Sequence, residues 1–340
     1  MKCPEITELP PPPPGKKGWP WTIEEFDVAH PGFVVGDNLE RRDRNTNTHW
    51  PKVSIVTPSF NQSQYLECTI RSVLLQGYPS LEYVIMDGGS SDGSIDIIRK
   101  YASWLDGWTS TRDKGQSEAI NNGFKRCTGD VFGWVNSDDY LMPGALFNLM
   151  TLRHEFPACL AWVGACREVD GDDQHIKVLK PMFGAAQEAG DWGRTTHICQ
   201  PSCLFSAKDF IEVGSLNEHL HYVMDVELWM KLLRRGTFAA SDYICSVSRV
   251  YMETKTKRNL LAKTAEFVAI NVYTGANGVA EEYLRRYIVH VKGIQTADDI
   301  EAQFDVVSIL DAMSTKKALA AFGRYGKMKL HRSLDRLLGR

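Results

Sequence analysis

Two adjacent carboxylates, Asp138 and Asp139, follow an apolar segment that runs from Val131 to Val135. Like charges side by side repel each other, so a fold that places them at the end of a strand needs a compensating cation. Carboxylate oxygens suit Mg²⁺ or Mn²⁺, and substrate phosphates often complete the coordination of such ions. A plain turn before a helix is the alternative, because Pro143 suits the first turn of a helix. These residues alone leave both interpretations open.

Polar, glycine-containing motifs also follow two earlier apolar segments. They are Thr57-Pro-Ser-Phe-Asn61 and Asp87-Gly-Gly-Ser-Ser-Asp-Gly93. Ligands of open parallel sheets bind beyond the carboxyl ends of the strands, and glycines let backbone N–H groups approach a ligand. Neither motif has the Walker or the dinucleotide-binding pattern. The carboxylates fit a site for a cation, a nucleotide base and a diphosphate, with an Asx-turn as the alternative for Asp87.

Hydrophobic periodicity predicts the elements that must position these motifs. We expect strands at 53–57, 81–86, 108–109 and 131–135. We also expect three helices: one that ends at Gly77, one that Ser94 caps, and one that spans 117–127. Alternating strands and helices favour a doubly wound α/β sheet. Further on, segments 161–169 and 176–179 flank a predicted hairpin turn at Asp170–Asp173, and a helix is expected before Gly236.

Bulk composition excludes several classes of protein. The net charge of -3 gives no reason to expect nucleic acid as a partner. The eight cysteines contain no Cys-x-x-Cys pair, which argues against a zinc site and favours free thiols in a reducing compartment. Neither a secretory signal nor an apolar run long enough for a bilayer is evident, so we expect a cytoplasmic protein.

Four motifs, in order and at fitting spacing, resemble those of family 2 glycosyltransferases. They are Val53–Asn61, Asp87–Gly93, Arg112-Asp-Lys-Gly-Gln116 and Asn136-Ser-Asp-Asp139. The resemblance covers roughly residues 50–255 and implies the GT-A fold, a Rossmann-like mixed, mostly parallel sheet flanked by helices. It also implies an inverting transferase that uses a nucleoside-diphosphate sugar, UDP above all. The third motif is typical of a bacterial branch that builds surface glycans.

The resemblance implies specific roles at the donor site. Asp87 would accept a hydrogen bond from the imide N–H of the base, and Asp138 would hold Mn²⁺ or Mg²⁺. Asn136 replaces the first acid of the family's Asp-x-Asp motif, which weakens the charge of the site. For Arg112 and Lys114 a solvated loop charge is the alternative. The full donor set is Thr57, Pro58, Ser59, Asn61, Asp87, Gly88, Arg112, Asp113, Lys114, Gln116, Asn136, Ser137 and Asp139.

The catalytic base is expected in the second half of the chain. Segment His221–Trp229 resembles the family segment with the base, so Asp225 matches that base and Glu227 is a weaker candidate. An acid favoured by the helix dipole is the alternative for Asp225. Gln200, Trp192 and His197 would form the acceptor site, and the acceptor would be a hydroxyl of a glycan or of a lipid-linked sugar.

One segment departs from the family pattern. Tyr251 stands near the position where the family often has a metal-binding His, and Glu253 is the residue that could replace it. This departure keeps a non-catalytic sugar-nucleotide or glycan-binding protein as the alternative function. A nucleotidyltransferase is disfavoured, because a Gly-rich basic loop would be expected after the first strand.

The chain is expected to have four parts. Residues 1–50 form a Pro-rich arm, 51–150 the nucleotide-sugar-binding half, 151–256 the half with the acceptor site and base, and 257–340 a helical extension. The last 25 residues carry eight Lys or Arg and one acid, Asp335. Two interpretations of this tail stay open: a solvated helical face, or an anchor on anionic lipid at the inner face of the membrane.

Overall fold

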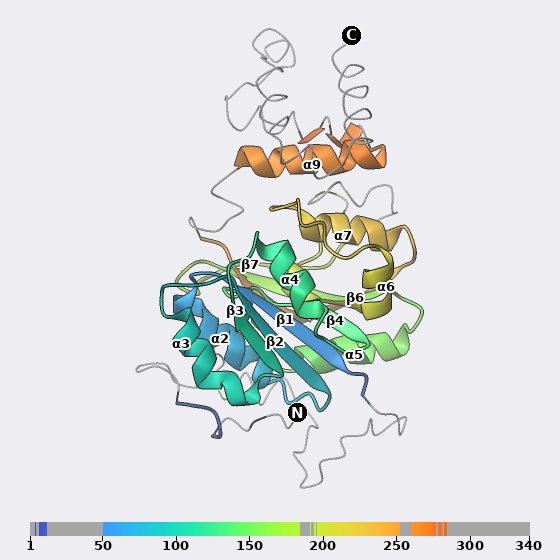
Figure 1. The fold of residues 1–340 in the computed structure, drawn as a ribbon. Helices are drawn as coiled ribbons and strands as arrows, with labels where there is room; N and C mark the ends of the chain where they lie inside the picture. The colour runs from blue at the N-terminus through green and yellow to red at the C-terminus, as the bar shows by residue number, and fades with distance from the viewer. Residues whose placement is uncertain are drawn as a thin grey trace. The chain divides into compact units, whose positions relative to one another are not determined.

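The computed structural model describes residues 4, 7–11, 50–183, 191, 194, 196–251, 260–276, 278–280, 282 and 283. The chain divides into two compact units. The first comprises Met1–Met182, His197–Ser215 and Arg235–Val250, and the second comprises Phe183–Thr196, Leu216–Arg234 and Tyr251–Arg340. Figure 1 labels the elements of both units. The Pro-rich arm, except for residues 4, 7–11 and 50, and the basic tail lie outside the described residues.

The first unit is built on one sheet whose first half is parallel. Its strands run in the order β3-β2-β1-β4, with β1 parallel to both neighbours. Their bounds are β1 Val53–Ser59, β2 Leu81–Asp87, β3 Gly107–Ser110 and β4 Val131–Trp134. The register pairs Ser59 with Asp87, so the polar residues after β1 and β2 meet at one edge. The expected α/β architecture is confirmed.

The second half of the sheet is mixed. β8 is antiparallel to both β4 and β6, β6 is parallel to β9, and β9 is antiparallel to β5. β7 pairs antiparallel with β6, which confirms the predicted hairpin. The bounds are β5 Tyr140–Leu141, β6 Ala161–Val169, β7 His175–Leu179, β8 Cys203–Ser206 and β9 Phe238–Arg249.

Helices cover both faces of the sheet. α2, α3 and α5 lie on one face and α4 on the other (Figure 1). The bounds are α2 Ser63–Leu74, α3 Ser94–Tyr101, α4 Gln116–Phe124, α5 Ala145–Glu155 and α6 Ala207–Glu212, with short 3-10 turns at Ala102–Trp104 and Gln200–Ser202.

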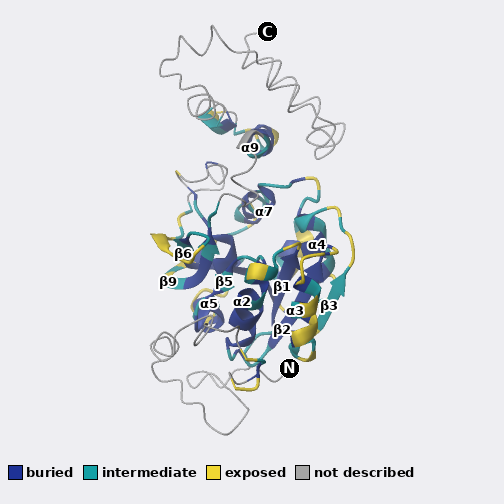
Figure 2. Cartoon of the chain, turned by 90° about the vertical axis from the view of Figure 1, so that its left-hand side faces the viewer, coloured by how far each residue is buried: buried dark blue, intermediate teal, exposed yellow. Residues whose placement is uncertain are grey.

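Burial follows the two-sided sheet. In β1, Val53 and Ile55 join the core formed with α2, α3 and α5, whereas Val56 faces α4. A Cβ on Gly123 of α4 would lie 2.6 Å from Val56 Cγ1, so only glycine lets this helix approach so closely. Figure 2 shows β1 and β2 buried along their length, as expected of a parallel sheet covered on both faces.

Two details differ from expectation. Leu9, in the arm that was expected to lie outside the core, is buried in the main core, and Pro10 accepts a hydrogen bond from the Arg71 guanidinium (2.6 Å). The N-cap of α3 is Gly93 rather than Ser94, because a positive φ of 98° at that position favours glycine.

Two further properties concern cysteines and membranes. The seven cysteines among the described residues are free thiols. No described helix has the length and apolar character needed to cross a membrane.

The second unit contains two described helices, α7 (Met224–Leu233) and α9 (Leu260–Thr274). Val268 and Val272 of α9 form a small core with Ala280 and Tyr283, and the rings of Phe267 and Tyr283 stack 4.5 Å apart. This core gives the C-terminal extension a packed helix of its own.

Glu82 of β2 is a buried acid of the parallel half with several hydrogen-bond donors around it. Its carboxylate accepts hydrogen bonds from Lys52 Nζ (2.9 Å), the Ser54 hydroxyl (2.5 Å) and the Thr128 N–H (2.7 Å). Burial alone would raise the pKa of Glu82, but these donors outweigh it and lower that pKa to about 2. The charged form of Glu82 therefore stabilises the fold.

We expect Glu82→Gln to lower the free energy of unfolding at pH 7 by ~1–2 kcal/mol, after allowance for solvent screening. Because the folded pKa lies below the ordinary value of 4.5, the contribution is present above pH 4.5 and is lost as pH falls towards 2. Urea denaturation of both proteins from pH 7 to pH 3.5 measures the difference. A difference that does not shrink below pH 4.5 would contradict this explanation.

Candidate functional site

The loops after β1 and β2 interlock through their polar groups. The Asn61 N–H donates to Ser90 Oγ (2.8 Å), and the Ser91 N–H donates to Asn61 Oδ1 (2.9 Å). The Gly88 N–H donates to the Ser59 carbonyl (2.8 Å). Asn61 adopts a positive φ of 52°, a conformation that asparagine tolerates better than most residues. The two loops therefore form a single rim at the carboxyl edge of the sheet.

Asp87 organises the second loop. One carboxylate oxygen accepts from the N–H groups of Gly89 (3.1 Å) and Ser90 (2.9 Å) and from the Ser110 hydroxyl (2.7 Å), and the other accepts from the Ser90 hydroxyl (2.5 Å). The bond to Gly89, two residues on, is the Asx-turn that the sequence allowed. The role of Asp87 towards a nucleotide base stays a prediction.

Gly88 lies against two side chains of the rim. A Cβ at this position would be 2.9 Å from Asp113 Oδ2 and 3.3 Å from the Phe60 ring, so a side chain here would displace both. Burial raises the pKa of Asp113, and the charges of Glu118 and Asp87 raise it further. The Phe60 ring is 61% exposed. Sequence reasoning did not single out Phe60, although an aromatic residue between Ser59 and Asn61 was a signal.

The strand-end hydroxyls have different surroundings. Thr57 is fully buried and its hydroxyl pairs with that of Tyr83 (2.9 Å), so it belongs to the core. Ser59 Oγ is buried and has no hydrogen-bond partner among the described residues. Because buried polar atoms are nearly always satisfied, Ser59 Oγ is a natural contact for a ligand or a water. Pro58 lies between them in β1.

The two cations of the third motif lie in solvent. Lys114 pairs with Glu118 (3.2 Å), and its side chain is 82% exposed. Arg112 is exposed as well, and its backbone lies next to Gly89. This is the solvated arrangement that the sequence offered as the alternative, and the roles of Arg112 and Lys114 towards a diphosphate stay predictions.

Asn136 connects donor and acceptor candidates in one network. Its Oδ1 accepts from Gln116 Nε2 (2.6 Å), and its Nδ2 donates to Asp139 Oδ2 (3.1 Å) and Gln200 Oε1 (3.4 Å). Gln200 in turn donates to the Trp134 carbonyl (2.6 Å). The amide at this position therefore tolerates a neighbouring carboxylate by donating to it, which an acid could not do.

Asp139 is a buried carboxylate beside a second one. It is 3% exposed. Burial is the main cause that raises its pKa, to about 7, and the charge of Asp138 adds to it. Hydrogen bonds from the Arg249 N–H (3.1 Å), the Ser248 hydroxyl and the Asn136 amide oppose the increase. This turn therefore favours an additional positive charge nearby.

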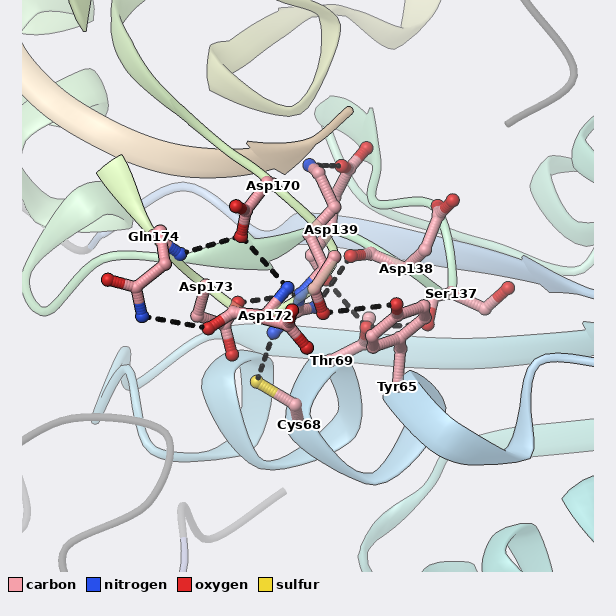
Figure 3. A network of polar contacts seen from close by, with 12 residues as sticks. Tyr65, Cys68, Thr69, Ser137, Asp138, Asp139, Asp170, Asp172, Asp173 and Gln174 are labelled. Carbon is pink, nitrogen blue, oxygen red and sulfur yellow. Dashed lines mark hydrogen bonds and ion pairs between the residues drawn. The ribbon is translucent and has the colours of Figure 1, made fainter. Parts of the chain in front are cut away.

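Arg249 at the end of β9 is buried behind the two acids. Its Nη1 donates to the Asp138 carbonyl (2.6 Å), and its Nε pairs with Asp173 Oδ1 (2.7 Å). Its guanidinium lies over the rings of Tyr65 (4.6 Å) and Tyr140 (4.8 Å). Figure 3 shows the Asp138–Asp139 turn between α2 and the hairpin turn that carries Asp173. Sequence reasoning missed this role of Arg249.

Thr69 of α2 holds the same turn from the helix side. Its hydroxyl lies 2.6 Å from the Asp139 carbonyl and 3.0 Å from that of Ser137 (Figure 3). Ser137 is itself buried, so its part in the site is that of backbone within the turn. The turn is therefore fixed from two sides, by α2 and by β9.

The donor set fits a divalent cation only in part. No three His, Cys, Asp or Glu side chains among the described residues converge on a metal position. Asp138 is half-buried, and Asp139 beside it would gain from a cation. Mg²⁺ commonly takes one or two carboxylates and completes its shell with water and substrate phosphates, which suits this pair. Tyr251 belongs to the second unit, and Glu253 lies outside the described residues.

The other two acceptor candidates are His197 and Trp192. His197 pairs with Met182 through both backbone groups (2.6 and 2.8 Å). Burial lowers the pKa of His197, and the charge of Glu168 opposes that effect. Trp192 lies outside the described residues.

Asp225 is the second residue of α7 in the second unit. The Val226 N–H donates to Asp225 Oδ1 (2.8 Å), and the side chain is half-buried. Burial raises the pKa of Glu227, while Lys231, 2.9 Å away, opposes the increase. An acid in the first turn also suits the helix dipole, so the base role of Asp225 stays a prediction.

We expect Arg249→Ala to lower the free energy of unfolding by ~3 kcal/mol, because it leaves Asp173 and the Asp138 carbonyl without their buried partner. Urea denaturation measures the loss. Arg99→Ala is the matched control, since Arg99 pairs with Asp96 on the exposed face of α3, where ion pairs contribute little. Equal losses in the two variants would show that Arg249 does not stabilise the turn.

Relatives of known sequence agree on one class of protein. An uncharacterized glycosyltransferase of Rickettsia typhi is 25% identical, over 81% of this chain and 89% of its own length. TuaG of Bacillus subtilis, whose name assigns it to teichuronic acid biosynthesis, is 36% identical over 56% of this chain and 75% of its own length. A β-1,3-glucosyltransferase of Campylobacter jejuni, acting on GalNAc(5)-diNAcBac-PP-undecaprenol by its name, is 26% identical over 59% and 64%.

Solved structures share the fold. Staphylococcus aureus TarS (residues 1–349), solved with UDP, has a TM-score of 0.53 and 15% identity, over 85% of this chain and 92% of that one. A mannosyltransferase of Pyrobaculum calidifontis, solved with GDP-Man and Mn²⁺, has a TM-score of 0.50 and 16% identity, over 84% and 88%. The family model described as glycosyl transferase family 2 matches residues 54–214. With these relatives and this fold, the chain belongs to glycosyltransferase family 2 and is a transferase enzyme.

Proposed function

We propose that the protein transfers a sugar from a nucleoside-diphosphate sugar, with UDP as the nucleotide, to a hydroxyl of a glycan or lipid-linked acceptor, with inversion of the anomeric centre. The observation that carries this proposal is the rim at the carboxyl edge of the sheet. The rim contains the buried Asp87 and the unpartnered hydroxyl of Ser59, and the carboxylates of Asp138 and Asp139 follow the neighbouring parallel strand β4 at the same edge. Nothing else in the described part of the first unit combines acids and a buried orphan hydroxyl in this way.

The donor would lie across this rim. The exposed Phe60 ring beside Gly88 offers an apolar surface for a flat base, and Asp87 offers a carboxylate to its imide N–H. Asp113, Arg112 and Lys114 follow on the neighbouring loop. UDP in the TarS structure and GDP-Man in the mannosyltransferase support nucleotide sugars as the donor class. The Campylobacter relative's name supports a lipid-linked acceptor.

Asp138 would hold the divalent cation, together with diphosphate oxygens and water, and the Asp139 carboxylate beside it would add negative charge. When bound, such a cation offsets charge that develops on the leaving diphosphate. The Mn²⁺ in the mannosyltransferase supports this assignment. Arg112 and Lys114 are both exposed on the loop after β3 and would turn towards the same negative charge, with Lys114 giving up its surface pair with Glu118.

The reaction itself is a single displacement. Asp225 takes the proton of the acceptor hydroxyl as its oxygen attacks the anomeric carbon. The new C–O bond forms as the bond from that carbon to the diphosphate oxygen breaks, and the diphosphate leaves with the electron pair. The sugar carries oxocarbenium-like charge in between. Attack from the side opposite to the leaving group inverts the anomeric centre.

We expect Asp225→Asn to lower the rate of UDP release from UDP-sugars by ~10²–10⁴-fold, the usual contribution of a general base, with UDP affinity unchanged. A coupled assay over a panel of UDP-hexoses gives the rate, and calorimetry gives the affinity. Asp242→Asn is the control, because Asp242 forms an exposed surface pair with Lys180. An Asp225→Asn variant with the native rate would refute the assignment of the base.

We expect Asp138→Asn to weaken UDP binding in the presence of Mn²⁺ by more than ~10-fold and to leave the weak, metal-free binding unchanged, because one ligand of the cation is lost. Titration of UDP with and without Mn²⁺ separates the two. The matched control is Asp172→Asn on the exposed hairpin turn. Retention of the native Mn²⁺ dependence in Asp138→Asn would place the cation elsewhere.

A further inference from the structure

The start of α7 has no cap of its own. Val223 occupies the N-cap position, with φ of -131° and ψ of 24°, and its apolar side chain cannot accept a hydrogen bond. The first N–H groups of a helix have no partner within the helix, and they need acceptors from elsewhere when they are shielded from water. Asp225 lies only two residues after Val223, so whatever holds this segment also sets the direction of Asp225.

Glu266, on α9, binds the N-cap residue of α7 and the two residues before it. Its carboxylate accepts from the N–H groups of His221 (2.9 Å), Tyr222 (2.7 Å) and Val223 (3.2 Å). Glu266 is buried, and a buried charge is tolerated only when hydrogen bonds compensate it. Bonds to an ionised acceptor are also shorter and stronger than neutral ones. A single side chain thus holds the backbone that leads into α7.

Lys263 strengthens the link between α9 and the base. It precedes Glu266 by three residues, so the two side chains share a face of α9. Burial lowers the pKa of Lys263, and the negative charge of Asp225 opposes that effect. The same turn of α9 acts on the backbone before α7 and on its second residue.

We propose that Glu266 is a positioning residue for Asp225, which fixes the backbone entering α7 and thereby the direction of the base. This inference rests on the proposed function. It also makes α9 part of the transferase machinery, although α9 lies beyond residues 54–214, which the family model matches. A displacement of a reacting group by about 1 Å can cost ~100-fold in rate, so a cap of this kind bears directly on turnover.

Kinetics of three variants test the proposal. We expect Glu266→Ala to lower kcat for UDP release from a UDP-sugar by ~30–100-fold, with the donor KM and the UDP affinity within about twofold of native, because the donor site belongs to the other unit. Glu266→Gln keeps one carbonyl oxygen as an acceptor, so we expect it to recover about tenfold of the lost rate.

Val272→Ala is the matched control for stability. Val272 is buried in the small core of α9 and bonds to none of the residues before α7, so its truncation loosens α9 without removing the cap. We expect a lowered Tm with kcat within about twofold of native at temperatures where the protein is folded. Circular dichroism on all variants confirms that rates are compared between folded proteins.

The outcomes separate the two proposals. A folded Glu266→Ala protein with native kcat, alongside an inactive Asp225→Asn protein, would overturn the positioning role and leave the proposed function intact. If Glu266→Ala does not fold, a native kcat in Glu266→Gln without any of the expected partial loss would overturn it. If Val272→Ala loses as much kcat as Glu266→Ala, α9 only stabilises the fold and Glu266 has no specific positioning role. An active Asp225→Asn protein would instead remove the proposed base, and with it the reason to position it.

Discussion

The burial of the Asp139 carboxylate next to Asp138 is the constraint on which the arrangement of the first unit depends. Two adjacent acids, one of them removed from water, are unfavourable unless hydrogen bonds and positive charge compensate them. The Asp139 carboxylate accepts hydrogen bonds from the Arg249 N–H at the end of β9 and from the Asn136 amide in the same turn, and the Thr69 hydroxyl of α2 holds the Asp139 carbonyl. Three elements therefore have to meet at this point for the turn to be stable.

This constraint also fixes the backbone of the turn. Arg249 binds the Asp138 carbonyl and Thr69 binds the Asp139 carbonyl, so the backbone is held without use of the Asp138 carboxylate. One carboxylate oxygen of Asp87, in contrast, accepts three hydrogen bonds from the loop that it organises and from β3. Aspartates at the same edge of the sheet thus have different roles. The hydrogen bonds of Asp87 compensate its negative charge, whereas the pair Asp138 and Asp139 would gain from a nearby cation.

The strands and the polar loops that follow them could be predicted from the sequence because local signals determine them. Alternation of apolar runs and helical stripes located β1, β2 and β4, and polar motifs after each strand located the rim. The roles of Arg249 and Glu266 could not be predicted, since each depends on contacts between residues far apart in the chain. Thr57 shows the same limit, because its partner Tyr83 lies on a neighbouring strand and turns its hydroxyl into the core.

We propose that this edge of the sheet binds a nucleoside diphosphate with the help of a divalent cation. Calorimetric titration of the native protein with UDP, TDP and GDP, each with and without Mn²⁺, gives the sharpest test of this proposal. We expect micromolar binding of UDP that depends on Mn²⁺, and weaker binding of the other two nucleotides. Absence of binding by all three nucleotides, or UDP binding of equal strength without the metal, would contradict it.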